Sequence, residues 1–162
     1  MKRNNGFTLL ELLAVIAIVI ILAGILIPSV GVVRKKAKSA RAQADIESLC
    51  VALKMLEADF GLYPTATNPN DLADYLGEPI GKNADGSINL TPAATDVTYG
   101  PYMEFKQKNL TGVRFDDPWS NAYIYTLTNP DPTNIPNRDF YIHSFGPNGT
   151  NNQGGTDDVY NW

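Results

Sequence analysis

The sequence predicts an α+β fold in which one long N-terminal helix packs on a small antiparallel β-sheet. Two observations lead to this prediction. Apolar residues dominate the first third of the 162-residue chain, and neither proline nor glycine interrupts residues 32–60. Runs rich in aromatic and β-branched residues, bounded by Asn, Pro and Gly, occur only in the last third. The helix is expected to span a membrane in its first half and to be amphipathic in its second half.

The first half of the predicted helix reads as a membrane anchor. Leu12 to Ile27 form 16 consecutive residues without a charged or strongly polar side chain. With its milder flanks the stretch covers residues 7–33, which as a helix extends roughly 40 Å and exceeds the hydrocarbon core of a bilayer. A cleaved secretory signal has a shorter apolar region of about 7–15 residues. We therefore expect an anchor that stays with the mature protein.

A cluster of positive charge follows the apolar run. Five cations occur within eight residues: Arg34, Lys35, Lys36, Lys38 and Arg41. Because the leader carries only Lys2 and Arg3, counting charges alone would place the large C-terminal part in the cytoplasm. The cluster is also suited to contact anionic lipid headgroups.

The second half of the helix, residues 34–60, carries one apolar stripe. Its members recur at spacings of three and four residues: Ala42, Ile46, Leu49, Cys50, Leu53, Leu56 and Phe60. Such a stripe must pack against another part of the protein. Gly61 and Pro64 end the helix. Cys50 is expected to act as a small buried apolar residue and not as a reactive thiol.

Residues 61–162 are expected to form a turn-rich acidic domain. Proline and Asx residues at 69–71 predict a short helix through Leu76, and residues 83–86 predict a turn. Residues 122–127, 139–144 and 159–162 are the predicted strands, and the linker between the first two, Thr128–Arg138, is too long for a tight hairpin.

Composition excludes several classes of protein and of site. A single cysteine rules out an intrachain disulfide, and a single histidine, His143, rules out a multi-histidine metal site within one chain. A net charge of −4 argues against a general nucleic-acid binder. The sequence has no Walker loop, no GxGxxG after a strand and no HExxH. We therefore predict no catalytic residues and no nucleic-acid partner.

The N-terminal residues carry a specific resemblance. Gly6-Phe7-Thr8-Leu9-Leu10-Glu11, followed by the apolar run, resembles the class III signal of type IV pilins and their relatives. The resemblance implies a pilin-like fold and a prepilin peptidase that cuts after Gly6, removes residues 1–6 and methylates the new amine at Phe7. Because that peptidase faces the cytoplasm, it also implies a single-pass protein of the bacterial inner membrane with residues 34–162 in the periplasm. This overrides the charge count.

Glu11 is unusual on physical grounds alone. A carboxylate in an apolar membrane helix is costly and often marks function. At the level of the headgroups, near the helix end, it would cost little. The resemblance to pilins implies that Glu11 pairs with the Phe7 amine of a neighbouring subunit in a filament, so that two costly charges neutralise each other.

Further motifs are similar to the major pseudopilins of type II secretion systems. They lie at residues 45–47, 61–65, 100–102, 117–123 and 145–149, with an apparent insertion near 77–98. The similarity implies a structural subunit that polymerises with other pseudopilins on an inner-membrane secretion platform. A type IV pilin of a surface fibre is the alternative within this class, and a membrane-anchored binding module that never polymerises is the alternative outside it. Of the quoted motifs Asp117-Pro118-Trp119 is the most specific, and it is expected to form a turn followed by an aromatic core residue.

The loop from Phe145 to Asp158 is the candidate metal site. Its residues alone favour an ordinary polar loop, because their spacing does not match an EF-hand. The resemblance implies a structural calcium ion, whose ligands would be the side chains of Asp157, Asp158 and Asn148 and the carbonyls of Phe145 and Thr150. Asn148 stands where the family usually has aspartate, so weaker calcium affinity than is typical is expected.

Overall fold

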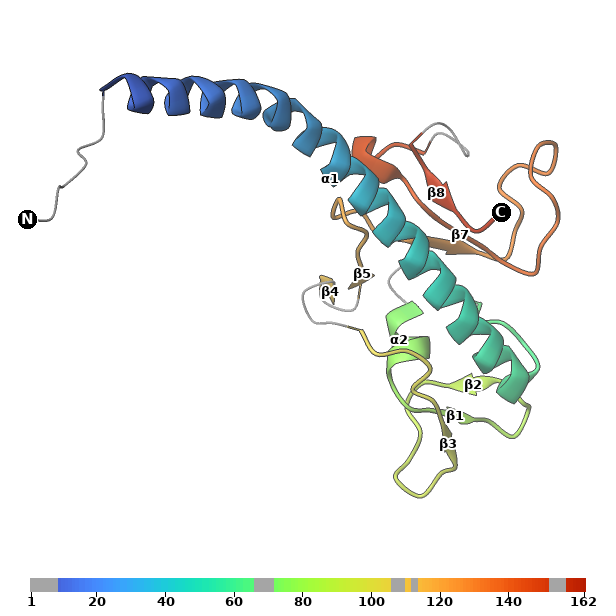
Figure 1. Cartoon of the computed structure of the whole chain (residues 1–162). Coiled ribbons are helices and arrows are strands. Elements are labelled where there is room, and N and C mark those ends of the chain that lie inside the picture. Colours follow the sequence, from blue (N-terminus) through green and yellow to red (C-terminus); the bar gives the residue numbers. More distant parts are fainter. Residues whose placement is uncertain (1–8, 66–71, 106–109, 112–113, 152–156) are drawn as a thin grey trace, which may run out of the picture. The chain divides into compact units, whose positions relative to one another are not determined.

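The computed structural model describes residues 9–65, 72–105, 110–111, 114–151 and 157–162. The chain divides into two compact units, Met1–Ala37 and Lys38–Trp162. Helix α1 (Leu9–Phe60) contributes 52 residues and belongs to both units (Figure 1). The predicted helix and its C-terminal end at Phe60 are confirmed.

Within the first unit, α1 exposes its apolar side chains. Its large aliphatic residues are about half exposed or more; they include Leu9, Leu10, Leu12, Leu13, Ile16, Val19, Ile20 and Ile21. In the part of the chain that the structure describes, α1 contains a stretch that is long and apolar enough to cross a membrane. Side chains of this kind need an apolar environment, which the first unit does not provide.

Within the second unit, the predicted stripe of α1 forms the centre of the core. Six predicted members are fully or nearly fully buried: Ala42, Ile46, Leu49, Leu53, Leu56 and Phe60. Ala52, which the prediction did not include, is buried beside them. Cys50 is half-buried at the edge of this stripe, where it packs against the core. The prediction that Cys50 is buried is therefore only partly correct, because Ala52 occupies the more central position.

The C-terminal sheet predicted from the sequence is present. Strands β6 (Ile124–Thr126), β7 (Tyr141–Ser144) and β8 (Val159–Tyr160) form an antiparallel sheet in the order β6-β7-β8. Tyr125 is paired with Ile142, and His143 with both Ile124 and Tyr160. Every residue of β7 is buried, as expected for a central strand.

The insertion near residues 77–98 builds a sheet that the sequence did not predict. Strands β1 (Ile80–Lys82), β2 (Ile88–Asn89) and β3 (Thr98–Tyr99) are antiparallel in the order β2-β1-β3. The predicted turn at residues 83–86 joins β1 to β2, with Gly86 at φ 89°. The predicted α+β fold is confirmed, and this sheet is an addition that the sequence did not indicate, because its strands are too short to give a clear alternating pattern.

The short helix predicted to run through Leu76 is α2 (Leu72–Gly77). A further two-stranded ladder pairs β4 (Leu110–Thr111) with β5 (Arg114–Phe115). Phe115 is buried and stacks on Tyr123, with ring centroids 5.2 Å apart. These elements add aromatic area to the core beneath α1.

Tyrosine hydroxyls tie the rest of the second unit to α1 and the chain that follows it. Tyr123 donates to Asp45 over 3.1 Å, Tyr102 donates to Asp59 over 2.8 Å, and Tyr125 donates to the Pro64 carbonyl over 2.9 Å. Burial, together with the Asp45 charge, raises the pKa of Tyr123 well above its usual value. These phenols therefore remain donors at any physiological pH and fix the position of the helix over the domain.

Candidate functional site

The predicted processing and assembly residues lie at the start of α1. Gly6 and Phe7 are outside the described residues. Glu11 lies in the first turn of α1 with an exposed side chain. A carboxylate in the first helical turn is favoured by the helix dipole, so its position is compatible with a stable helix end.

The Asp117 turn organises the other candidate site. The buried Asp117 carboxylate accepts hydrogen bonds from the backbone amides of Trp119 (2.8 Å) and Asn121 (2.9 Å), and from the Ser144 hydroxyl. Ser120 has a left-handed φ of 72°, which closes the turn. The predicted turn is confirmed, and Trp119 packs half-buried against the core as expected.

Asn121 connects this turn to the start of the Phe145–Asp158 loop. Its side-chain amide donates to the Gly146 carbonyl over 3.0 Å. Gly146 begins the short 3₁₀ helix η2 (Gly146–Asn148), and its own amide donates to the Ser144 hydroxyl over 3.0 Å. Two hydrogen-bonded contacts from the 117–121 turn, through Ser144 and Gly146, therefore hold the beginning of the loop.

Glycine at position 146 allows the two ends of the loop to touch. Gly146 has φ 64°, and a Cβ atom added there would overlap the backbone carbonyl oxygen of Asp157. The start of η2 and the Asp157-Asp158 pair are thus brought together, although they are separated by more than ten residues. Residues 152–156, which complete the loop, lie outside the described residues.

The predicted ligands have different surroundings. Phe145 is half-buried immediately before η2, and Asn148 and Thr150 are exposed. The Asn148 side-chain oxygen already accepts a hydrogen bond from the Thr150 amide at 2.7 Å, although a carbonyl oxygen has a second lone pair. Asp157 and Asp158 are both half-buried. No group of three His, Cys, Asp or Glu side chains is clustered among the described residues.

The donor set suits a hard cation better than a transition metal. It contains two carboxylates, one amide oxygen and backbone carbonyls, which are the ligands that calcium takes. A site with only two charged ligands needs carbonyl oxygens to complete six or more positions. The structure places one backbone oxygen, the Asp157 carbonyl, against Gly146 at the start of the loop.

His143 is a packed histidine beside the loop. It is 5% exposed, and its ring lies 5.4 Å from the Phe145 ring and 5.7 Å from the Trp162 ring. Burial lowers the pKa of His143, while the nearby Asp158 charge opposes that shift. Burial in this aromatic cluster thus favours the neutral form of the imidazole.

Sequence reasoning missed that Asn121 and Ser144 hold the loop. Asn121 belongs to the same motif as Asp117-Pro118-Trp119, so the motif was found but only its turn was assigned. The signal that could have identified Asn121 is a second Asx side chain placed directly after a tight turn, where its amide can reach another segment.

Comparison with known protein families decides the relationship of the chain. Residues 1–27 match the prokaryotic N-terminal methylation motif, and residues 30–162 match type II secretion system (T2SS), protein G. The chain belongs to the type II secretion system protein G family. The resemblance to major pseudopilins predicted from the sequence is confirmed.

Individual relatives support the same assignment along the whole chain. The type II secretion system core protein G of Escherichia coli is 32% identical over 160 residues, covering 99% of this chain and 92% of that protein. The core protein G of Pseudomonas aeruginosa is 28% identical, with 99% and 96% covered. The type IV major pilin protein PilA of Myxococcus xanthus is 34% identical, but over only 49% of this chain and 36% of that protein. The similarity therefore favours the secretion family over surface pilins.

Proposed function

We propose that this protein is the structural subunit of a periplasmic pseudopilus that drives protein export in type II secretion. One observation carries the proposal: the methylation motif and the protein G domain follow each other in one chain and together account for almost all of it. The fold is consistent with a mechanical role, since α1 combines a membrane-compatible stretch with a face that anchors a globular domain.

The maturation step follows from the N-terminal motif. A prepilin peptidase would cleave after Gly6 and leave a methylated amine at Phe7, with the leader in the cytoplasm. The domain after α1 would then lie in the periplasm, and the protein would cross the inner membrane once. Glu11 follows Phe7 by four residues in the sequence, and we propose that the amine of one subunit approaches the Glu11 carboxylate of its neighbour when the N-terminal helices stack.

The Glu11–Phe7 pair would link extraction from the membrane to assembly. Each charge alone is unfavourable in an apolar environment, and their neutralisation stabilises the stacked state over the separated one. Repeated addition of subunits at the inner-membrane platform would lengthen the filament and push secreted proteins outward.

Removing the gene should distinguish this function from that of a surface pilin. We expect secreted proteins to accumulate in the periplasm and to disappear from the medium, and a plasmid copy of the gene should restore export. The measurement is the distribution of an exported enzyme between periplasm and medium. Undiminished export, with loss of a surface fibre instead, would assign the chain to the pilin alternative.

We further propose that the Phe145–Asp158 loop holds a structural calcium ion. Asp157 and Asp158 would supply the charge, Asn148 an amide oxygen, and Phe145 and Thr150 their carbonyls. The close approach of Gly146 to the Asp157 carbonyl supports this, because it brings Asp157 and Asp158 to the end of the loop where Phe145 lies. A bound cation would offset the repulsion between the two adjacent carboxylates and the entropic cost of ordering a glycine-rich loop.

Calcium should therefore stabilise the folded domain. A ligand that binds only the native state adds about 2.7 kcal/mol at a hundredfold excess over its dissociation constant. We expect residues 38–162 to melt several degrees higher in millimolar calcium than in chelator. Asp157→Ala should remove most of this difference, and Asn148→Asp should enlarge it by adding a charged ligand.

The matched control is Glu78→Ala, which removes an exposed carboxylate between α2 and β1. This variant should keep the full calcium-dependent increase in melting temperature. Magnesium should replace calcium poorly, because it requires a tighter octahedral site. The calcium assignment is withdrawn if the unmodified domain melts at the same temperature in calcium and in chelator.

A further inference from the structure

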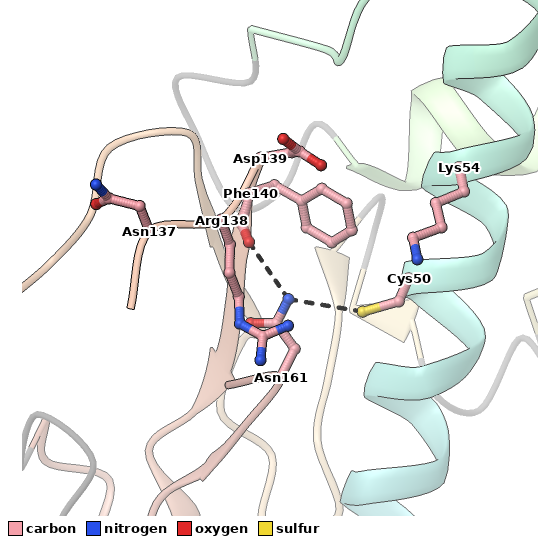
Figure 2. A pocket seen from close by; sticks show the side chains of 7 residues that line it. All are labelled: Cys50, Lys54, Asn137, Arg138, Asp139, Phe140 and Asn161. Atoms are coloured by element: carbon pink, nitrogen blue, oxygen red, sulfur yellow. Dashed lines mark hydrogen bonds between the residues drawn. The ribbon is translucent and has the colours of Figure 1, made fainter. Parts of the chain in front are cut away.

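A polar pocket lies between α1 and the C-terminal sheet, away from the Phe145–Asp158 loop. Its volume is about 420 Å³, and α1 contributes Cys50 and Lys54 to its wall. The opposite wall is the segment 137–140, which leads into β7, and Asn161 completes the lining (Figure 2). All of these residues belong to the second unit of the chain.

Asn161 gives the pocket a fixed base. Its side-chain oxygen accepts a hydrogen bond from the Ile142 amide at 3.0 Å. Its side-chain nitrogen donates to the Phe140 carbonyl over 3.4 Å and lies 3.7 Å from the Cys50 sulfur. The C-terminal strand, the segment before β7 and α1 therefore meet at one side chain. These contacts build the base of the pocket, whereas Asn137, Arg138 and Asp139 of its wall belong to the exposed segment before β7.

The pocket contains two cations, Lys54 on the α1 wall and Arg138 on the opposite wall. Figure 2 shows Lys54 descending from α1 toward Cys50 and the Arg138 guanidinium lying beside Asn161, whereas the Asp139 carboxylate points away from both. The ion pairs recorded among the described residues are Arg41–Asp45 and Arg114–Asp116, so neither Lys54 nor Arg138 is part of one.

Both cations affect the pKa of the Cys50 thiol. Burial raises the pKa of Cys50 above its ordinary value and the Glu47 charge adds to that rise, while the Asn161 hydrogen bond, Lys54 and Arg138 oppose it. Two cations and one carboxylate, that of Asp139, line the pocket, so the net charge of its lining is positive. The second unit, residues 38–162, carries sixteen Asp and Glu against eight Lys and Arg, so two cations outside an ion pair stand out on this acidic domain. A carboxylate is the group that such a pocket would take.

The exposed apolar surface beside the pocket favours a protein as the partner over a small anion. On α1, each pocket residue is followed by an exposed apolar residue: Val51 is 59% exposed and Met55 is 52% exposed. The two are one helical turn apart and therefore lie side by side. A free anion could not cover them, whereas a protein surface that places a carboxylate in the pocket would.

We propose that this pocket receives an acidic side chain of a second copy of the chain, with Val51 and Met55 covered in the same contact. The occupant follows from charge complementarity, because the acidic domain of each copy supplies the carboxylates that the pocket of its neighbour lacks. This inference rests on the proposed function, since it requires subunits that assemble side by side.

The positive potential of the pocket is tested on the full chain in detergent, before any assembly. Cys50 is the only cysteine, so its rate of modification by a methanethiosulfonate reports on the pocket directly. The ratio of the rate with an anionic sulfonatoethyl reagent to that with a cationic trimethylammonioethyl reagent is measured. We expect Lys54→Glu to lower this ratio about tenfold, as electrostatic focusing predicts. Lys38→Glu, the same reversal at another exposed lysine of α1, should leave it unchanged.

The second copy as occupant is tested on assembled filaments. Cys50 should react at least tenfold more slowly in filaments than in detergent, and Arg138→Glu should reduce filament yield much more than Lys38→Glu does. Equal reaction rates in both states would overturn the proposal and leave the pocket as a site for a small anion only. Equal defects in the two variants would also overturn it. If the unmodified chain forms no filaments, the proposed function fails, while the reagent ratio in detergent still reports on the pocket by itself.

Discussion

Glu11→Leu is expected to abolish filament assembly and to leave membrane insertion intact. Leucine makes α1 more apolar, so insertion should be as efficient as in the unmodified chain or better. In the assembled state, however, the neighbour's Phe7 amine would be left without its partner. Removing one member of a buried ion pair costs about 3–5 kcal/mol, which corresponds to a loss of roughly a hundredfold or more in association.

Two further variants separate charge from packing at this position. Glu11→Gln keeps the length of the side chain but loses its charge, and it should fail like leucine. Glu11→Asp keeps the charge on a shorter side chain and should assemble in part. Filament yield is measured against the amount of the variant in the membrane fraction. Assembly of the leucine variant at the unmodified rate would show that Glu11 has another role.

Gly6→Val is expected to block maturation completely. The branched side chain adds bulk next to the bond that the peptidase must cleave, so uncleaved protein should accumulate in the membrane and remain unassembled. Asn5→Val places the same side chain one residue earlier and should still be processed. The measurement is the intact mass of the purified chain, which should fall by residues 1–6 and rise by one methyl group in the unmodified protein.

The masses also show how the interpretation could fail. An unmodified chain that begins at Met1, or at any residue other than Phe7, would contradict cleavage after Gly6. Normal maturation of Gly6→Val would show that the peptidase does not require glycine here.

The long helix and the C-terminal sheet could be predicted because their signals are dense. The spacing of Ile46, Leu49, Leu53 and Leu56 repeats over several turns, and all four are fully buried. The sequences of β6 and β7 are rich in aromatic and β-branched residues. The sheet β2-β1-β3 has strands of two or three residues, so local pattern carries little information about it. Its formation depends on turns such as residues 83–86, where Asp85 accepts hydrogen bonds from Ser87.

The candidate sites depend on contacts between distant segments, which local sequence cannot reveal. The ligand set of the loop was inferred from resemblance, and it remains a prediction. The bonds from Asn121 to Gly146 and from Ser144 to Asp117 connect residues that are 25 and 27 positions apart. The pocket joins residues that are even further apart in the sequence, because Cys50 and Asn161 are 111 positions apart. Local sequence patterns identify the residues of each segment, but they do not show that the two segments are in contact in the folded protein.

Polymerisation is the central claim, and electron microscopy of sheared preparations tests it most directly. Cells that overproduce the chain together with a type II secretion machine should release thin filaments, and antibodies against residues 61–162 should label them along their length. The Glu11→Leu variant, expressed to the same level in the membrane, should release none. If the unmodified chain is recovered only as a membrane-bound monomer under these conditions, it is an anchored binding module and not a pseudopilus subunit.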